Sequence, residues 1–123
     1  MDIHGAAVLI ELFPIAARTV TTNGAGFDAT QHLGLGKAIL DAGAGGGTTP
    51  TLDVKLQDSA DNASFADIAG AAFAQVTTVA SLQSIAVNLD SARAFIRAVA
   101  TIGGTTPTFT FGVIIVARKQ VMP

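Results

Sequence analysis

The side chains that could support catalysis or bind metal are few in this chain, and their spacing fits no known motif. Cysteine is absent and the only histidines are His4 and His32, so a closed zinc site would need carboxylate ligands from elsewhere. Gly34-Leu35-Gly36-Lys37 has the lysine of a phosphate-binding loop, but Gln31 stands where the first glycine belongs and Ala38 replaces the Ser or Thr. We therefore predict neither a metal site nor a phosphate loop.

The acidic residues give no better sign of chemistry. Asp58, Asp61 and Asn62 lie close together, but their spacing is not that of a calcium loop, and the expected glycine and downstream glutamate are missing. Acid pairs such as Asp53 and Asp67 carry no sign of working together, and no Ser-His-Asp arrangement follows from spacing. We predict that the chain is not an enzyme and uses no cofactor.

The composition favours a protein that binds other proteins. Charged residues make up 13% of the chain, with seven basic and nine acidic side chains scattered singly and a net charge of −2. Soluble domains typically contain about 25% charged residues. No basic patch is present to neutralise phosphates, so nucleic acid is not an expected partner. Because so few charges must cover the surface of a small domain, we expect part of that surface to be buried against other subunits.

Membrane and sugar partners are also disfavoured. Ala6–Phe13 is apolar, but Glu11 and Pro14 interrupt the apolar stretch, which is too short for a membrane span and predicts a buried strand that stops at Pro14. All seven aromatic residues are Phe, whereas a sugar-binding platform usually uses Trp or Tyr. The lack of cysteine suits a protein assembled in a reducing cytoplasm.

The C-terminal third predicts one long β-hairpin, around which the other strands assemble. Its arms are Ala94–Ile102 and Thr108–Arg118, and the glycine- and proline-containing stretch Gly103–Pro107 is the expected turn. Val113–Val116 is apolar at successive positions, so we expect both of its faces to be covered.

Two further stretches alternate between apolar and polar residues, which indicates strands with one buried face. They are Leu52–Asp58 and Gln83–Asp90. Together with the second arm of the hairpin they predict a buried core that consists of Leu52, Val54, Leu56, Ile85, Val87, Leu89, Phe109, Phe111, Val113 and Ile115.

Three segments remain ambiguous. Lys37–Ala42 is compatible with a helical turn, although the flanking glycines favour a short strand. Gly70–Val79 places Phe73 and Val76 in the core and could also contain a helical turn. Residues 1–17 are either an N-terminal arm that reaches a neighbouring subunit or an edge strand of the same domain.

One six-residue sequence occurs twice. Gly46-Gly47-Thr48-Thr49-Pro50-Thr51 is identical to Gly103-Gly104-Thr105-Thr106-Pro107-Thr108. The copies are either two equivalent loops presented at one end of the molecule or two convenient hairpin turns. The first copy overlaps the predicted surface loop Gly43–Pro50. Many short strands with turns every 8–12 residues predict an all-β protein, with residues 1–123 forming a single antiparallel β-sandwich or jelly-roll-like domain.

The pattern of strands and turns resembles that of a family of phage proteins. Leu52–Asp61 followed by Phe65–Ile68, and Arg93–Val99 leading to Gly104–Phe109, are similar to segments of small structural proteins of tailed bacteriophages that decorate or cement the head. The likeness spans roughly Thr51 to Lys119. It implies a virion structural protein that binds the outer capsid surface and stabilises or decorates the head, with the major capsid protein as its partner.

The resemblance and the composition lead to further expectations. We expect a homo-oligomer, with a trimer favoured, that is assembled in the cytoplasm of the bacterial host and resides on the capsid surface of the virion. Four arginines are the candidate protein-contact residues: Arg18, Arg93, Arg97 and Arg118. Each could equally be a solvated charge at a strand end. The alternative function is that of a receptor- or glycan-binding β-domain of a phage fibre, head spike or tail.

Overall fold

The chain folds as a single antiparallel all-β domain, as the sequence predicts. The computed structural model describes residues 7–30 and 32–119, and within these residues it contains eight strands and no helix. The strands are β1 (Ala7–Arg18), β2 (Thr22–Asn23), β3 (Phe27–Asp28), β4 (His32–Ala42), β5 (Gly46–Ser59), β6 (Ala66–Ala72), β7 (Ser81–Asn88) and β8 (Phe95–Lys119). None of the described residues forms a helix that is long and apolar enough to cross a membrane.

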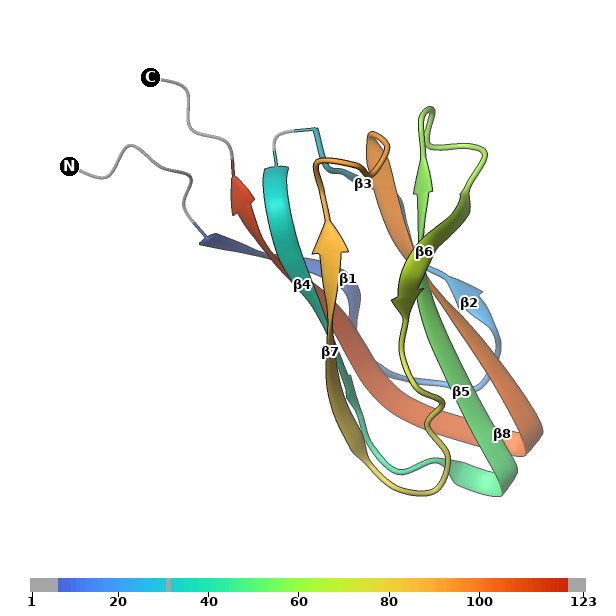
Figure 1. Cartoon of the computed structure of the whole chain (residues 1–123). Coiled ribbons are helices and arrows are strands. Elements are labelled where there is room, and N and C mark those ends of the chain that lie inside the picture. The colour runs from blue at the N-terminus through green and yellow to red at the C-terminus, as the bar shows by residue number, and fades with distance from the viewer. Residues whose placement is uncertain (1–6, 31, 120–123) are drawn as a thin grey trace.

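Strand β8 is the centre of the fold. Its first half pairs with β5 and with the short strands β2 and β3, whereas its second half pairs with β1 and β4. Figure 1 shows β8 running down one side of the molecule, bending at the bottom and continuing up the other side. The resulting strand order β6-β5-β8-β4-β7 forms a sheet that is nearly closed into a barrel-like fold.

The segment that follows β6 is linked through a side chain to β7, the strand at the other end of this order. The Gln83 amide Nε2 donates a hydrogen bond to the Ala74 carbonyl at 2.9 Å, and Gln83 Oε1 accepts one from the Ala74 N–H at 2.8 Å. Both polar backbone groups of Ala74 are therefore satisfied by one glutamine, which bonds them as the backbone of a neighbouring strand would.

The core lies between the two halves of the bent sheet. All of the predicted core residues are buried except Ile85, which is half-buried and packs against the core. In the stretch Val113–Val116 the inward Val113 and Ile115 are fully buried, but Ile114 and Val116 are only half-buried. The expectation that both faces of this stretch are covered is therefore met fully on the inner face and only in part on the outer one.

The predicted C-terminal hairpin is wrong, because β8 is continuous through Gly103–Pro107. This segment pairs with the first copy of the repeated sequence on β5, so that Thr48 lies opposite Thr105 and Thr51 lies opposite Gly103. The two copies thus lie together, as one of the two readings of the repeat expected, but they are strand segments. The predicted surface loop Gly43–Pro50 is accordingly reduced to the three residues before β5.

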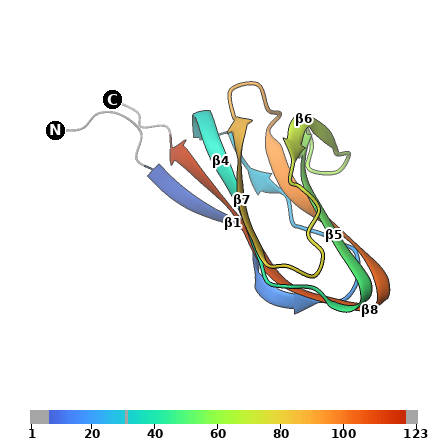
Figure 2. The same ribbon diagram turned by 60° about the horizontal axis from the view of Figure 1, so that its bottom comes forward.

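The repeated sequence bends both strands without reversing them. In each copy the second glycine and the second threonine have positive φ angles, 96° and 47° at Gly47 and Thr49, and 113° and 45° at Gly104 and Thr106. Two residues with positive φ angles, with one residue between them, kink the strand and still let it continue to pair with its neighbour. Because Thr48 and Thr105 pair directly, the copies are related by a local two-fold axis at the corner where β5 turns beside β8 (Figure 2).

The N-terminal strand also departs from its predicted end. β1 continues past Pro14 to Arg18 and lies along β8, with register shifts on both sides of Phe13. Proline lacks an N–H donor and is tolerated in a strand at such an irregularity. Of the ambiguous segments, Lys37–Ala42 belongs to β4 and Gly70–Val79 contains no helical turn. Residues 1–6, which include His4, lie outside the described residues, as do Gln31 and the side chain of His32.

Candidate protein-contact surfaces

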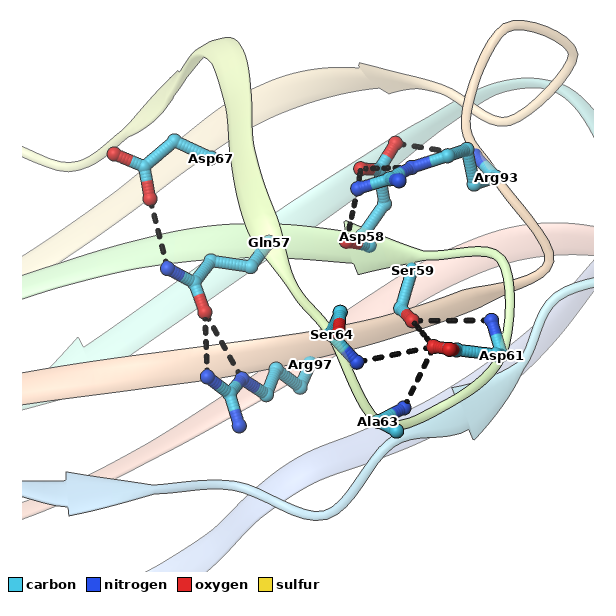
Figure 3. A network of polar contacts seen from close by, with 9 residues as sticks. All are labelled: Gln57, Asp58, Ser59, Asp61, Ala63, Ser64, Asp67, Arg93 and Arg97. Carbon is cyan, nitrogen blue, oxygen red and sulfur yellow. Dashed lines mark hydrogen bonds and ion pairs between the residues drawn. The ribbon is translucent and has the colours of Figure 1, made fainter.

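A ladder of polar side chains covers the outer face of β5 and the first half of β8 (Figure 3). Gln57 is at its centre: Nε2 donates to Asp67 Oδ1 at 2.8 Å, and Oε1 accepts from Arg97 Nε at 2.9 Å and Nη2 at 2.8 Å. Lys55 adds an ion pair to Asp67 at 3.0 Å. The hydrogen bond from Gln57, followed by the one from Lys55, holds the pKa of Asp67 below its usual value.

Arg97 belongs to this polar face, whereas Arg93 binds Asp58, which alternates with Gln57 along β5 and so points to the other side of the sheet. The Arg97 guanidinium stacks over the Phe65 ring at 4.1 Å while it donates to Gln57. Arg93 holds Asp58 through an ion pair of 2.9 Å between Nη2 and Oδ1, and its backbone N–H donates to Asp58 Oδ2 at 3.1 Å. Both candidate arginines are thus engaged within the chain, and their role toward a partner stays a prediction.

The acidic cluster forms a turn, as the sequence indicates. Asp61 Oδ1 accepts hydrogen bonds from the N–H groups of Ser64 and Ala63 at 3.0 Å each and from Ser59 Oγ at 2.8 Å. These bonds, the one from Ser64 first, lower the pKa of Asp61 to about 2. Asp53, the other carboxylate considered above, accepts from Gln75 Nε2 at 3.0 Å. Each carboxylate has its own local partner, which is the arrangement of a structural turn or ladder.

Arg18 closes the irregular part of β1. Its guanidinium donates to the carbonyls of Pro14 at 2.8 Å and Phe111 at 3.0 Å. The same group lies 4.7 Å from the centroids of the Phe13 and Phe111 rings, which contact each other edge to face. One side chain therefore satisfies the carbonyls that the bulge leaves outside the ladder and covers two core rings.

Arg118 differs from the other three candidate arginines. It is exposed near the end of β8, and it makes no hydrogen bond or ion pair with any other described residue. Its side chain points to the outer face of the sheet formed by β1, the second half of β8, β4 and β7, because the neighbouring Ala117 is buried on the inner face. Arg118 is thus the candidate that is available to a partner.

That outer face is apolar, and we call it the apolar face. It consists of Leu9, Ile15, Leu35, Ile39, Leu82, Ile114 and Val116. Four of these side chains are 67% to 75% exposed, and only Val20 and Val79, both in loops, are comparable among the described large hydrophobic residues. A hollow of about 220 Å³ lies between Ile15, Ile114 and Leu82. Sequence reasoning missed this face, although the apolar residues at alternate positions of β1 and β4 were its signal.

The comparisons with known proteins add no family. A scan of the sequence against models of protein families found no match, and a search among curated proteins found none either. Within residues 7–30 and 32–119 no group of three or more His, Cys, Asp or Glu residues is placed to hold a metal ion. The features that carry a functional argument are therefore the two contrasting outer faces, one polar and satisfied within the chain, the other apolar and open.

Proposed function

We propose that this protein is a virion structural protein, which binds the outer surface of a bacteriophage capsid and stabilises or decorates the head. The observation that carries the proposal is the apolar face: Leu9, Leu35 and Leu82 are each more than 70% exposed on one side of a small domain. Leaving such a patch in water is unfavourable at about 25 cal/mol per Å² of apolar surface, so a protein partner is expected to cover it. The resemblance of residues 51–119 to small phage head proteins supplies the class of partner.

The remainder of the surface is consistent with a structural role. The polar side chains of the second outer face bind one another, as in the ladder around Gln57, and so they stiffen the domain. A rigid domain binds without a large cost in ordering its own side chains. On a shell, many copies at symmetry-related sites multiply modest contacts into stable attachment.

The proposal includes the partners and the location expected from the sequence. The major capsid protein is the principal partner, the copies associate as a homo-oligomer for which three subunits are favoured, and the protein resides on the virion after assembly in the host cytoplasm. Among the candidate arginines, Arg118 is the one we assign to a contact between proteins. The proposed function involves no catalysis, cofactor, nucleic acid or membrane.

Co-sedimentation with empty capsids tests this function. Where a capsid gene neighbours the gene of this chain, shells are assembled from its product, and purified protein is centrifuged with and without those shells. We expect it to pellet only with the shells and to saturate at a fixed number of copies per shell. A folded protein that stays in the supernatant at every shell concentration would refute the proposal, and retention on glycans of the host surface instead would favour a fibre, spike or tail domain.

A further inference from the structure

The apolar face carries charges that are sorted by sign along the strands. The register of β8 with its neighbours places Asp41 beside Gly112 and Glu11 beside Ile114, which makes this end of the face acidic. Lys37 lies beside Val116, two residues further along β8, and Arg118 follows after another two. The acids therefore lie at the levels of residues 112 and 114 of β8 and the bases at the levels of 116 and 118, with apolar side chains beside them along the whole face.

All four of these charged groups are available. Glu11, Lys37, Asp41 and Arg118 are exposed, and none of them makes a hydrogen bond or an ion pair with another residue of the described ranges. This distinguishes them from the charges of the polar face, which bind each other through the ladder around Gln57. Two acids and two bases leave the face without net charge, so a partner of strong net charge gains little from it.

We propose that this face binds the same face of a second copy of the chain, turned end for end about an axis that crosses the strands. The inference concerns the free protein, rests on the homo-oligomer of the proposed function, and gives it a two-fold contact in place of the three subunits favoured there. In a two-fold contact each surface must be complementary to itself. A face that is acidic at one end and basic at the other meets this condition in the reversed orientation, because the acidic end of each copy then lies over the basic end of the other.

The strand geometry fixes which groups meet. Residues on one face of a strand are about 6.8 Å apart and neighbouring strands are about 4.8 Å apart. When the axis passes between Ile114 and Val116, Asp41 of one copy lies opposite the level of Arg118 of the other copy. The two residues are displaced sideways by about one strand, so the Asp41 carboxylate is within reach of the Arg118 guanidinium. Ile114 of each copy lies over Val116 of the other. Two sheets packed in this way keep their strands within about 30° of alignment, as in the commonest sheet-on-sheet packing.

The size of the face predicts the strength of the contact. Four strands, followed from residue 112 to residue 118 of β8, give a flat footprint of roughly 15 by 20 Å, or about 300 Å² per copy. This is less than half of the about 800 Å² per partner that a stable interface buries. We therefore expect dissociation constants in the micromolar range or weaker for the free protein, and a dimer in place of the three subunits favoured above.

Sedimentation equilibrium from about 1 µM to about 1 mM protein tests the inference. The wild-type chain should shift reversibly from monomer to dimer. Leu82→Asp should raise the dissociation constant at least tenfold, whereas Val79→Asp, at an equally exposed loop residue, should leave it unchanged. Circular dichroism of each variant verifies that it is folded. A wild-type chain that stays monomeric throughout, or equal effects of the two variants, would overturn the inference.

A charge exchange tests the orientation independently. Asp41→Arg or Arg118→Asp alone should weaken the dimer several-fold, because each opposes like charges, and the double variant should recover most of the affinity. Two single variants whose effects simply add in the double variant would contradict the reversed arrangement. Shell binding separates this inference from the proposed function. A wild-type chain that stays monomeric but binds shells overturns only the inference, and a wild-type chain that dimerises but never binds shells overturns only the function.

Discussion

Alanine at Gly47 or Gly104 should destabilise the domain more than any other glycine substitution on β5 or β8. Their φ angles of 96° and 113° lie outside the region that a residue with a Cβ atom readily adopts. An added Cβ at Gly104 would also lie 2.7 Å from the Thr49 carbonyl oxygen, and one at Gly47 would lie 2.7 Å from that of Thr105. Both obstacles are backbone atoms, which cannot rotate away as a side chain can.

The magnitude follows from adding the two effects. A residue forced into a disfavoured backbone region costs about 1–3 kcal/mol, and an overpacked contact costs about 1–3 kcal/mol more. We therefore expect each substitution to lower the free energy of unfolding by about 2–6 kcal/mol. Whole domains are typically stable by about 5–15 kcal/mol, so at the middle of both ranges the loss is about two fifths of the total. Because a local two-fold axis relates the two sites, their losses should be similar.

Two other glycines separate the contributions. Gly46, the preceding residue, has no positive φ, and an added Cβ would meet only atoms at 3.8 Å or beyond, so Gly46→Ala should stay within about 0.5 kcal/mol of wild type. Gly70 has a φ of 75° with open space around it, so Gly70→Ala should show the backbone cost alone, about 1–2 kcal/mol.

Urea denaturation, followed by circular dichroism, measures all four variants under the same conditions. The expected order of destabilisation is Gly46→Ala below Gly70→Ala, and Gly70→Ala below Gly47→Ala and Gly104→Ala. If Gly47→Ala is no less stable than Gly46→Ala, the paired kink does not exist as described, and the assignment of β8 as one continuous strand must be abandoned.

Three further predictions concern the core, the acidic turn and the closure of the sheet. Phe111→Ala should lower the free energy of unfolding by about 3–5 kcal/mol, because the ring is fully buried and carries the Arg18 guanidinium, and a loss below about 1 kcal/mol would contradict the packing. The Asp61 carboxyl should titrate near pH 2 by NMR. Because its pKa in the folded state is depressed, the stability it provides is present above about pH 4 and is lost as the pH falls toward 2, and Asp61→Asn should remove this dependence. Gln83→Leu should speed hydrogen exchange at the Ala74 amide with little effect on β8, and an unchanged rate would show that the glutamine does not hold the segment after β6 to β7.

The sequence allowed the fold class and most of the core to be predicted, because burial on one side of a strand imposes alternation on the residues themselves. Leu52, Val54 and Leu56 are buried where their pattern indicates, and Asp53 between them is exposed. The half-buried Ile85 is on β7, which has a strand neighbour on one side only, so its side chain is covered less completely.

The connections between strands could not be derived in the same way, because local residue types do not distinguish a turn from a kink. Glycine and proline within Gly103–Pro107 permit either one, and the choice depends on what lies opposite. Here the opposite residues are the first copy of the same sequence, which kinks equally and so keeps the ladder intact. The exact repetition was the available signal, since two neighbouring strands that bend at one corner need matching bends.

The arginines illustrate a similar limit on predicting contacts. Arg18 and Arg97 were expected at a protein contact because arginine suits such sites, yet both stack on Phe rings of their own chain. Which phenylalanine lies beside which arginine depends on pairing over long distances in the chain, which no local pattern reports. Arg118 lies on an open face because its side chain alternates with that of the buried Ala117.

The position of β8 in the chain order has a consequence for biosynthesis. β1 to β5 all pair with β8, yet β8 follows every one of them, so the ribosome releases five strands before their common partner exists. Only the β4–β7 and β5–β6 pairs can form earlier. We expect folding to wait for β8 and then to proceed in one step, with the unpaired strand edges exposed to chaperones in the meantime. We expect a chain interrupted before residue 95 to lack the strand that joins these two pairs, and therefore to stay unfolded.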